Sequence, residues 1–292
     1  MQKLVIIIPT FNRKAYLKEL LSILNRSKDV SAAIDIIVVN DGSTDGTTSM
    51  LKNEFPEIIE VKGDGNWWWT RSVNEGLKVA IEKGHDYFLL MNDDTIVEKT
   101  FLSKIMETHS RVGGILGTIS ISSTKPEKIF YSGIKSTNWL TAKQVRYHQF
   151  FEAYDKVLEG VKPTVFIPGR GMLFRKEIID KIGYLDEKLF PQYFADYDFS
   201  HTALEHGFPL NVSWDSPVYS YVEKTAKGNK TNATFIQFIA AFFKPNTSNN
   251  IKHTWYFYKK HAGPLFIIGF TLHLLRVVAA YMLARFRGVL KN

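Results

Sequence analysis

Short apolar runs and longer amphipathic stretches alternate along the first part of the chain. Three short runs are rich in apolar, β-forming residues, at residues 4–8, 34–39 and 87–91, and only Asp35 interrupts them. Such runs are typical of strands that are covered on both faces of a parallel sheet. Stretches with helical character separate them, at residues 14–24, 44–52 and 69–82. This alternation predicts a doubly wound α/β fold.

A polar cluster follows each predicted strand. The clusters are Pro9-Thr10-Phe11-Asn12-Arg13, Asn40-Asp41-Gly42-Ser43 and Asn92-Asp93-Asp94. Right-handed crossovers bring the carboxyl ends of parallel strands to one edge of the sheet, where open α/β sheets bind their ligands. We therefore expect the three clusters to line one crevice.

The pattern loosens after residue 99. A helix is predicted near residues 100–110, and short strand-like pieces separated by Gly and Pro then run to residue 168, which indicates a mixed, partly antiparallel extension of the sheet. Helices are predicted again at residues 176–182 and 196–206, each closed by a Gly in the C′ position. A stretch rich in Asn, Lys and Thr at residues 224–232 marks the expected end of the body, which divides the chain into residues 1–223 and a tail of residues 224–292.

Charge separates the body from the tail. The chain has 292 residues, 45% of them apolar, and a net charge of +8. Residues 224–292 carry eleven Lys and Arg and no Asp or Glu, so residues 1–223 have 26 basic and 29 acidic side chains. A segregated basic tail indicates an anionic partner, either a phospholipid surface or nucleic acid. The chain has no Cys, which excludes disulfides, thiolate metal sites and thiol nucleophiles.

The tripeptide Asn92-Asp93-Asp94 is the strongest candidate for metal chemistry. It places two adjacent carboxylates where a strand ends. A hard divalent cation held by such carboxylates and by phosphate oxygens neutralises a diphosphate, and two carboxylates this close repel each other unless a cation intervenes. The alternative is that Asp94 or Thr95 only caps the following helix.

Three other segments are candidates for binding or acid–base chemistry. Asp41 can accept hydrogen bonds from a base or a ribose, although its turn is also explained as a capped helix start. The loop Gly63-Asp64-Gly65-Asn66-Trp67-Trp68-Trp69 opens a helix, and at least one of its Trp rings is expected to line a pocket. Asp196 lies among aromatics at a helix N-terminus, a position that suits either acid–base work or helix capping.

In their order and spacing, these segments resemble the successive motifs of family 2 glycosyltransferases of the GT-A fold, among them bacterial rhamnosyl-, galactosyl- and glucosyltransferases of surface polysaccharide synthesis. The resemblance covers roughly residues 3–215. The segments are "VIIIPTFNR", "VVNDGSTDGT", "GNWWWTRSVNEGL", "LLMNDDT", "PGRGMLFRKEIIDKIGYLDE" and "YFADYDFSHTALEHGF". It implies a Rossmann-like, nucleotide-sugar-binding half at residues 1–99, an acceptor-side half at residues 100–223 and a mixed central sheet.

The resemblance also implies a donor site. Asn92-Asp93-Asp94 stands where the family has its Asp-x-Asp motif, so Asp94 is expected to be the principal ligand of Mg²⁺ or Mn²⁺, with Asp93 toward the sugar or ribose. A further metal ligand, often a His, follows the base in many relatives. The corresponding stretch here has no His, and Asp215 or water is the substitute considered. The residues expected to bind the donor nucleotide are Pro9, Thr10, Phe11, Asn12, Arg13, Asp41, Gly65, Asn66, Trp67, Asn74, Asn92 and Asp93.

The expected reaction is a single, inverting displacement. Asp196 matches the second position of the family's Glu-Asp pair and would act as general base on an acceptor hydroxyl. Ala195 replaces the first member of that pair. The turn Gly169-Arg170-Gly171, together with Asp198, is expected to border the acceptor. His201 and His206 follow on the same predicted helix, where surface or capping roles are expected rather than metal ligation.

The tail is predicted to be helical and to associate with a membrane. Residues 264–284 form a largely apolar stretch of 21 residues, within a helix expected near residues 264–288. Because Arg276 lies near its midpoint, we expect the helix to lie in the interface rather than to span the bilayer. Packing on the body or on a second subunit is the other possibility. Trp255-Tyr256-Phe257-Tyr258, followed by two Lys, suits the headgroup layer.

The sequence therefore predicts an inverting, metal-dependent enzyme that transfers a hexose or deoxyhexose from a UDP- or dTDP-sugar to a glycan, expected to be lipid-linked. It would act in the cytoplasm as a peripheral protein of the inner membrane face, either as a monomer or as a homo-oligomer. A nucleotidyltransferase and a non-catalytic sugar-nucleotide-binding protein are the alternatives. Nucleic acid is not an expected partner, because no base-reading motif accompanies the basic tail.

Overall fold

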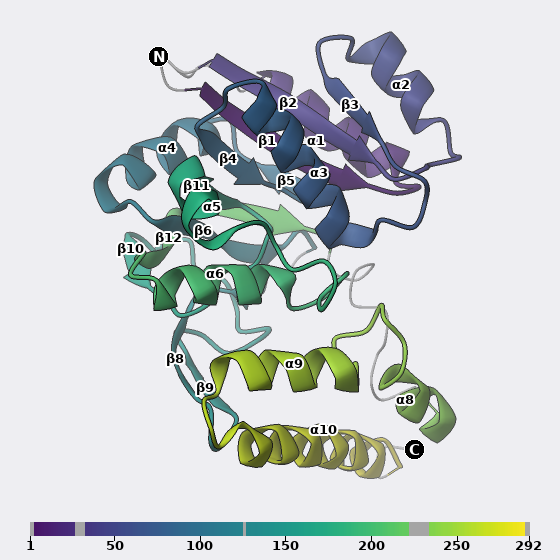
Figure 1. Ribbon diagram of the computed structural model, residues 1–292, viewed down its shortest axis with the longest axis vertical. Coiled ribbons are helices and arrows are strands. Elements are labelled where there is room, and N and C mark those ends of the chain that lie inside the picture. The colour runs from purple at the N-terminus through teal and green to yellow at the C-terminus, as the bar shows by residue number, and fades with distance from the viewer. Residues whose placement is uncertain (1–2, 27–32, 125–126, 222–233, 290–292) are drawn as a thin grey trace.

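The computed structural model describes residues 3–26, 33–124, 127–221 and 234–289 (Figure 1). Four parallel strands form its amino-terminal half in the order β3-β2-β1-β4. They are β1 (Lys3–Thr10), β2 (Ala33–Asn40), β3 (Ile59–Lys62) and β4 (Tyr87–Leu90). The three strands predicted from apolar runs are confirmed. The short edge strand β3 was not predicted.

The second half extends the same sheet through mixed pairing. Past β4 the order continues β11-β6-β12-β10, with β11 antiparallel to both β4 and β6 and with β12 parallel to β6. The remaining strands pair at the margins, β5 with β12 and β7 with β6, while β8 and β9 form a separate two-stranded sheet. The bounds are β5 (Thr95–Val97), β6 (Ile115–Ser122), β7 (Ile129–Tyr131), β8 (Ile134–Asn138), β9 (Lys143–Arg146), β10 (Val161–Pro163), β11 (Met172–Arg175) and β12 (Leu210–Ser220).

Helices cover both faces of the sheet, and alternate residues of β1 point into two cores. Ile6 and Ile8 pack in the core formed with α1, α2 and α4, whereas Val5 and Ile7 pack in the core formed with α3, α5 and α6. The helices are α1 (Lys14–Arg26), α2 (Thr47–Glu54), α3 (Trp68–Glu82), α4 (Phe101–Val112), α5 (Lys176–Ile182) and α6 (Ala195–Glu205). This arrangement confirms the predicted mixed α/β fold.

Helix α2 begins three residues later than predicted, and the reason lies in Asp45. One carboxylate oxygen of Asp45 accepts hydrogen bonds from the backbone and hydroxyl of Thr47, at 3.2 and 2.6 Å, and the other accepts from the backbone of Lys14 at 2.8 Å. The turn before the helix is therefore held against the start of α1, and the helix can begin only after it.

The described part of the tail folds into α8 (Phe235–Ala241), α9 (Ile251–His261) and α10 (Phe266–Val289). Figure 1 shows α9 between α6 and α10. The expected boundary near residue 223 and the linker-like stretch lie outside the described residues. By length and composition, Phe266–Phe286 is long and apolar enough to cross a membrane.

Helix α9 corrects the prediction made for the aromatic cluster. Phe257 belongs to the main core, and Tyr258 is buried against Trp139 and Phe270. Trp255 makes edge-on contacts with Phe266 and Phe270 of α10. Placement of this whole cluster in a headgroup layer is therefore wrong, because its rings join the body to α10.

Candidate functional site

Two buried carboxylates lie near the carboxyl ends of β1 and β4, where the sequence predicts a crevice. Asp93 and Asp94 follow β4, and both are nearly inaccessible, with exposed fractions of 4% and 2%. The hydroxyl of Thr10 donates to Asp93 Oδ2 at 2.8 Å. Arg13 Nη1 donates to Asp93 Oδ1 at 2.9 Å and to Asp94 Oδ2 at 3.1 Å. The structure therefore brings two of the predicted strand-end clusters into one network.

Two carboxylates and two guanidinium groups meet at this network. The pKa of Asp93 is raised to about 6, chiefly by burial and also by the neighbouring Asp94, against the opposing effect of Arg13. Asp94 Oδ1 is buried and accepts no hydrogen bond from any described residue. Arg170 Nη2 lies 3.8 Å from this oxygen. A buried oxygen acceptor with an unused lone pair is the donor type that Mg²⁺ and Mn²⁺ bind, so the residues present fit such an ion.

Asp41 organises the second wall of the crevice. Its Oδ1 accepts from the backbone of Gly65 at 2.8 Å, and its Oδ2 accepts from the backbones of Trp67 and Trp68 at 2.9 and 3.2 Å. A Cβ at Gly63 would lie 2.5 Å from Asp41 Oδ1, so only glycine permits this close approach. Asp41 thus fixes the loop that leads into α3.

Trp69 links the segment after β4 to the segment before α6. Its indole Nε1 donates to Asn92 Oδ1 at 3.2 Å, and its backbone donates to Gln192 Oε1 at 3.0 Å. A Cβ at Gly169 would lie 2.3 Å from the Trp69 ring, so the ring packs directly on that backbone. The triple Trp sequence predicted at least one pocket-lining ring and Trp67 as the donor-binding residue, but it did not predict the contacts of Trp69 with Asn92 and Gln192.

Asp196 lies in the first turn of α6, and backbone amides hold its carboxylate. Gly169 donates to Oδ2 and Tyr197 donates to Oδ1, each at 2.9 Å. Burial raises the pKa of Asp196, although these two bonds and the charge of Arg170 oppose the shift. The preceding Phe194 has a φ of 74°, a strained conformation for a residue with a side chain. This left-handed residue comes immediately before α6, so Asp196 lies in the first turn of the helix.

Four other residues predicted to bind the donor lie in the first strand-end cluster and in the loop before α3, and they differ in exposure. Asn12 Oδ1 accepts from the backbone of Thr44 at 2.8 Å, which ties the first cluster to the second. Phe11 is 50% exposed and Asn66 is also exposed, whereas Pro9 is buried in β1. Phe11 and Asn66 are therefore accessible to a ligand, and Asn12 holds the wall in place.

The turn at residues 169–171 runs along the other side of Asp94. Gly171 has a φ of 77°, donates to Leu90 O at 2.9 Å, and has no room for a Cβ because Thr118 Oγ1 would lie 2.4 Å away.

Ala195, beside Asp196, is fully buried. Asp215 accepts from the backbone of Gly160 at 2.9 Å. None of the described contacts brings Asp215 to Asp94 as a further ligand.

Asn74, predicted on the donor side, is engaged elsewhere. It is 3% exposed, and its amide bonds the backbone of Leu185 and the carboxylate of Glu187. These contacts fasten α3 to the segment that leads toward α6. No described contact of Asn74 involves the Asp93–Asp94 network.

Asp198, predicted on the acceptor side, faces the tail. Its two oxygens accept from Lys260 Nζ at 2.8 Å and pair with His261 Nε2 at 2.9 Å. It also lines a small cavity together with Tyr184 and Lys260. Because both partners belong to the end of α9, the carboxylate connects α9 to α6.

Family comparison agrees with this arrangement. The model of Glycosyl transferase family 2 matches residues 5–183. This match covers more than half of the chain, which therefore belongs to that family.

Two similar proteins are named as glycosyltransferases. The chain is 46% identical over 113 residues to the abequosyltransferase RfbV of Salmonella typhimurium, a match that covers 35% of this chain and 31% of RfbV. It is 28% identical over 223 residues, 70% of this chain and 62% of the relative, to a dolichyl N-acetyl-glucosaminyl phosphate diacetamido-dideoxy-glucuronosyltransferase of Methanococcus voltae. The chain thus spans from about a third to under two thirds of these relatives' lengths.

A solved structure has the same fold. The mannosyltransferase PcManGT of Pyrobaculum calidifontis, determined with GDP-mannose and Mn²⁺, aligns with a TM-score of 0.59 at 13% identity, over 97% of this chain and 74% of the other. At this identity the likeness establishes the GT-A fold of the chain.

Proposed function

We propose that the protein is an inverting, metal-dependent glycosyltransferase that uses a UDP- or dTDP-hexose or deoxyhexose. The observation that carries the proposal is the continuity of the site. Arg170 lies 3.8 Å from Asp94 in the strand-end network, and the backbone of the adjacent Gly169 donates to Asp196 at 2.9 Å. A group that binds diphosphate and a group that accepts a proton are therefore held on one rigid framework. Membership of Glycosyl transferase family 2 supports the same reaction class.

In this reaction an acceptor hydroxyl attacks the anomeric carbon. The new bond joins the acceptor oxygen to that carbon, the bond from the carbon to the diphosphate breaks, and the electron pair leaves with the diphosphate. The acceptor proton passes to the carboxylate of Asp196. The anomeric configuration inverts because there is one displacement.

Two guanidinium groups prepare the donor side for the leaving diphosphate. Arg13 is 30% exposed and faces the crevice, while the buried Arg170 Nε has no acceptor among the described residues. A phosphate oxygen would supply that acceptor. A divalent cation bound at Asp94 would add charge neutralisation for the diphosphate. The Mn²⁺ in the structure of PcManGT is consistent with this proposal.

Donor class is tested by a thermal-shift screen of UDP-, dTDP- and GDP-sugars in the presence of Mn²⁺. We expect UDP- or dTDP-sugars to raise the unfolding midpoint, because ligands that bind only the folded state stabilise it. The stabilising donor should also be hydrolysed slowly to the free nucleoside diphosphate. Stabilisation by GDP-sugars alone would contradict the donor assignment, and pyrophosphate release from a nucleoside triphosphate would identify a nucleotidyltransferase instead.

We further propose that the tail binds an anionic membrane and that the acceptor is a lipid-linked glycan of surface polysaccharide synthesis. This assignment places the protein at the cytoplasmic membrane face. One side of α10 packs on α8 and α9, where Phe238 stacks on Tyr281 at 4.0 Å. The opposite side exposes large apolar side chains: Ile267, Ile268, Leu272, Leu275, Val278, Met282, Leu283 and Phe286. An apolar face on a tail without acidic residues suits a negatively charged lipid surface.

Charge introduced on that face should release the protein from lipid. Leu275 and Leu283 are 59% and 58% exposed, so the double variant Leu275→Glu/Leu283→Glu should fold normally. We expect its partition into phosphatidylglycerol vesicles to fall by about 100-fold or more, since burial of two leucines contributes about 3–6 kcal/mol. Vesicle flotation measures the effect. Ser103→Glu, an exposed site on α4, is the control and should bind like the unaltered protein. Equal binding by all three proteins would refute the interfacial tail.

A further inference from the structure

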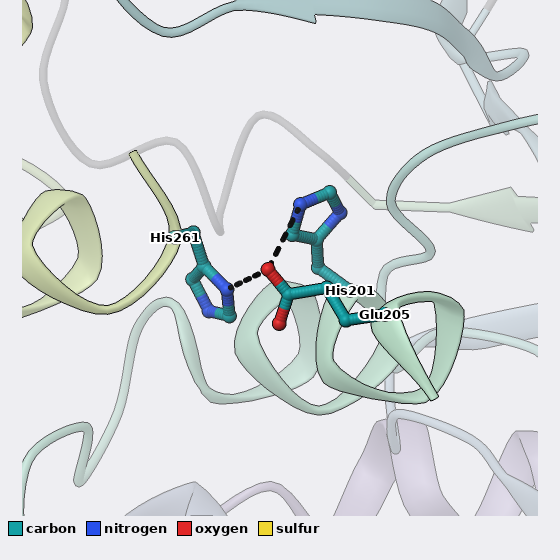
Figure 2. A group of neighbouring side chains, drawn as sticks. All are labelled: His201, Glu205 and His261. Carbon is teal, nitrogen blue, oxygen red and sulfur yellow. Dashed lines mark hydrogen bonds and ion pairs between the residues drawn. The ribbon is translucent and has the colours of Figure 1, made fainter. Parts of the chain in front are cut away.

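A second cluster of ligand-type side chains joins α6 to α9, away from the Asp93–Asp94 network. His201 and Glu205 lie one turn apart on α6, and His261 is the last residue of α9. Figure 2 shows the two imidazole rings turned toward the carboxylate between them. Glu205 Oε1 is 3.3 Å from His261 Nδ1 and 3.9 Å from His201 Nε2. The ligand atoms of the three residues all lie within 4.8 Å of one another.

The outer nitrogen of each ring is already bound to an acceptor. His201 Nδ1 lies 2.9 Å from Val165 O, and His261 Nε2 lies 2.9 Å from Asp198 Oδ1. Both acceptors require a hydrogen on those nitrogens. In the neutral rings the lone pairs therefore sit on His201 Nε2 and His261 Nδ1, and both point at Glu205. Metal-binding histidines are oriented in this way, with the second N–H donated to a carbonyl or a carboxylate.

With both rings neutral, this arrangement has no positive charge at its centre. His201 Nε2 and Glu205 Oε1 are both acceptors when the ring is neutral, and they face each other without a hydrogen between them. The rings are enclosed: Trp139 stacks on His261 with centroids 6.1 Å apart, and the side chain of His201 is 12% exposed. A bound cation would convert this repulsion into attraction.

We propose that His201, Glu205 and His261 bind a structural Zn²⁺ ion that fastens α9 to α6. Two imidazoles and one carboxylate suit Zn²⁺ better than Mg²⁺, which prefers oxygen ligands. Ligand atoms in a tetrahedral Zn²⁺ site are about 3.3 Å apart, given bond lengths of about 2.0–2.1 Å. The contact between Glu205 and His261 already has this spacing, and the side chain of Glu205, which is 42% exposed, is free to move toward His201. Water would complete the coordination.

The position of the ion gives it a mechanical role. Helix α6 carries Asp196 in its first turn, and α9 packs against α10. An ion between the two helices would therefore hold the tail at a fixed position relative to the crevice. Asp198, which orients His261, becomes an outer support of this site. This inference does not depend on the donor or acceptor proposed above.

The test uses the full-length, tag-free protein after chelator treatment and dialysis. Zinc titration followed by elemental analysis should give one tightly bound Zn²⁺ per chain. A free Zn²⁺ concentration about 100 times the dissociation constant of the site should raise the unfolding midpoint of the protein by about 5 °C. Glu205→Gln and His201→Gln should each weaken binding by about 100-fold or more and abolish the shift, because even outer supports of metal ligands contribute about 10–100-fold.

Two matched variants separate this site from other sources of zinc binding. His206 is an exposed histidine on the turn that ends α6, and His206→Gln should bind Zn²⁺ like the unaltered protein. Asp94→Asn, which alters the strand-end network, should also keep the tight site. Glu205 is on the surface, so its variant remains informative if His201→Gln fails to fold. Less than half an equivalent of tightly bound Zn²⁺ would overturn the proposal. So would undiminished binding by Glu205→Gln, or loss of binding in His206→Gln or Asp94→Asn.

Discussion

Replacement of Asp196 by Asn is expected to lower the turnover number for sugar transfer by about 10²–10⁴-fold, the usual contribution of a positioned general base. Asn cannot accept the acceptor proton, but it matches the size of Asp and can still accept from the amide of Tyr197. Donor affinity should not change, because the donor-side groups Arg13, Asp41 and Asp94 are untouched. The loss should therefore appear in kcat rather than in donor binding.

The measurement is steady-state transfer with parallel titration of donor binding. Asp180→Asn is the control, since Asp180 is an exposed carboxylate on α5 that pairs with Lys176 and should leave the rate unaltered. Activity of the unaltered enzyme should rise with pH through the pKa of Asp196, which burial places above its ordinary value, because only the ionised form accepts a proton. A variant that keeps more than about a tenth of the rate would exclude Asp196 as the base.

The strand-end clusters were predictable because their positions follow from topology. Strands β1, β2 and β4 are largely buried on both faces, so each appears in the sequence as an apolar run that is interrupted only by Asp35 in β2. Parallel pairing then brings the residues after these strands together, and the bond between Thr10 and Asp93 is the direct consequence. Residues 83 positions apart were placed in one site by a rule that needs no side-chain detail.

Residues whose roles depend on distant partners were harder to predict. Asp198 sits in the first turn of α6 like Asp196, and nothing local distinguishes the two. Its partners Lys260 and His261 are 62 and 63 positions away, on a helix whose docking has no sequence signature. Asn74 is a similar case, because Leu185 and Glu187 are more than a hundred positions away. The edge strand β3 is only four residues long and is only partly buried, so it lacks the continuous apolar pattern.

The aromatic segment of α9 illustrates a different limit. Trp255, Phe257 and Tyr258 beside two Lys look alike whether they face lipid or protein, because rings and aliphatic stems suit both environments. The structure resolves the choice through packing, with Phe257 in the core and Trp255 against α10. His201 was expected to have a surface or capping role. Its partner His261 is 60 positions further along the chain, and no motif connects them.

Replacement of Asp94 by Asn is expected to reduce kcat/KM for transfer by about 10²–10³-fold, since charge stabilisation by a bound cation contributes several kcal/mol. Asp94 Oδ1 is the buried oxygen without a hydrogen-bond partner among the described residues, and an amide oxygen is a much weaker ligand for Mn²⁺ or Mg²⁺. The variant should also lose the increase in thermal stability that Mn²⁺ gives in the presence of donor. Asp86→Asn is the control: it alters an exposed carboxylate immediately before β4, whereas Asp94 lies after it.

Cation binding should depend on pH in a direction set by Asp93. Burial raises the pKa of Asp93 to about 6, so this carboxylate is largely protonated at pH 5 and ionised at pH 7. Because a cation at Asp94 is attracted by the second negative charge, Mn²⁺ affinity should increase as the pH rises through 6 and level off above it. Calorimetric titration of Mn²⁺ at pH 5, 6 and 7 measures this increase. Full transfer activity in chelator, together with an active Asp94→Asn variant, would show that Arg13 and Arg170 stabilise the leaving diphosphate without a metal.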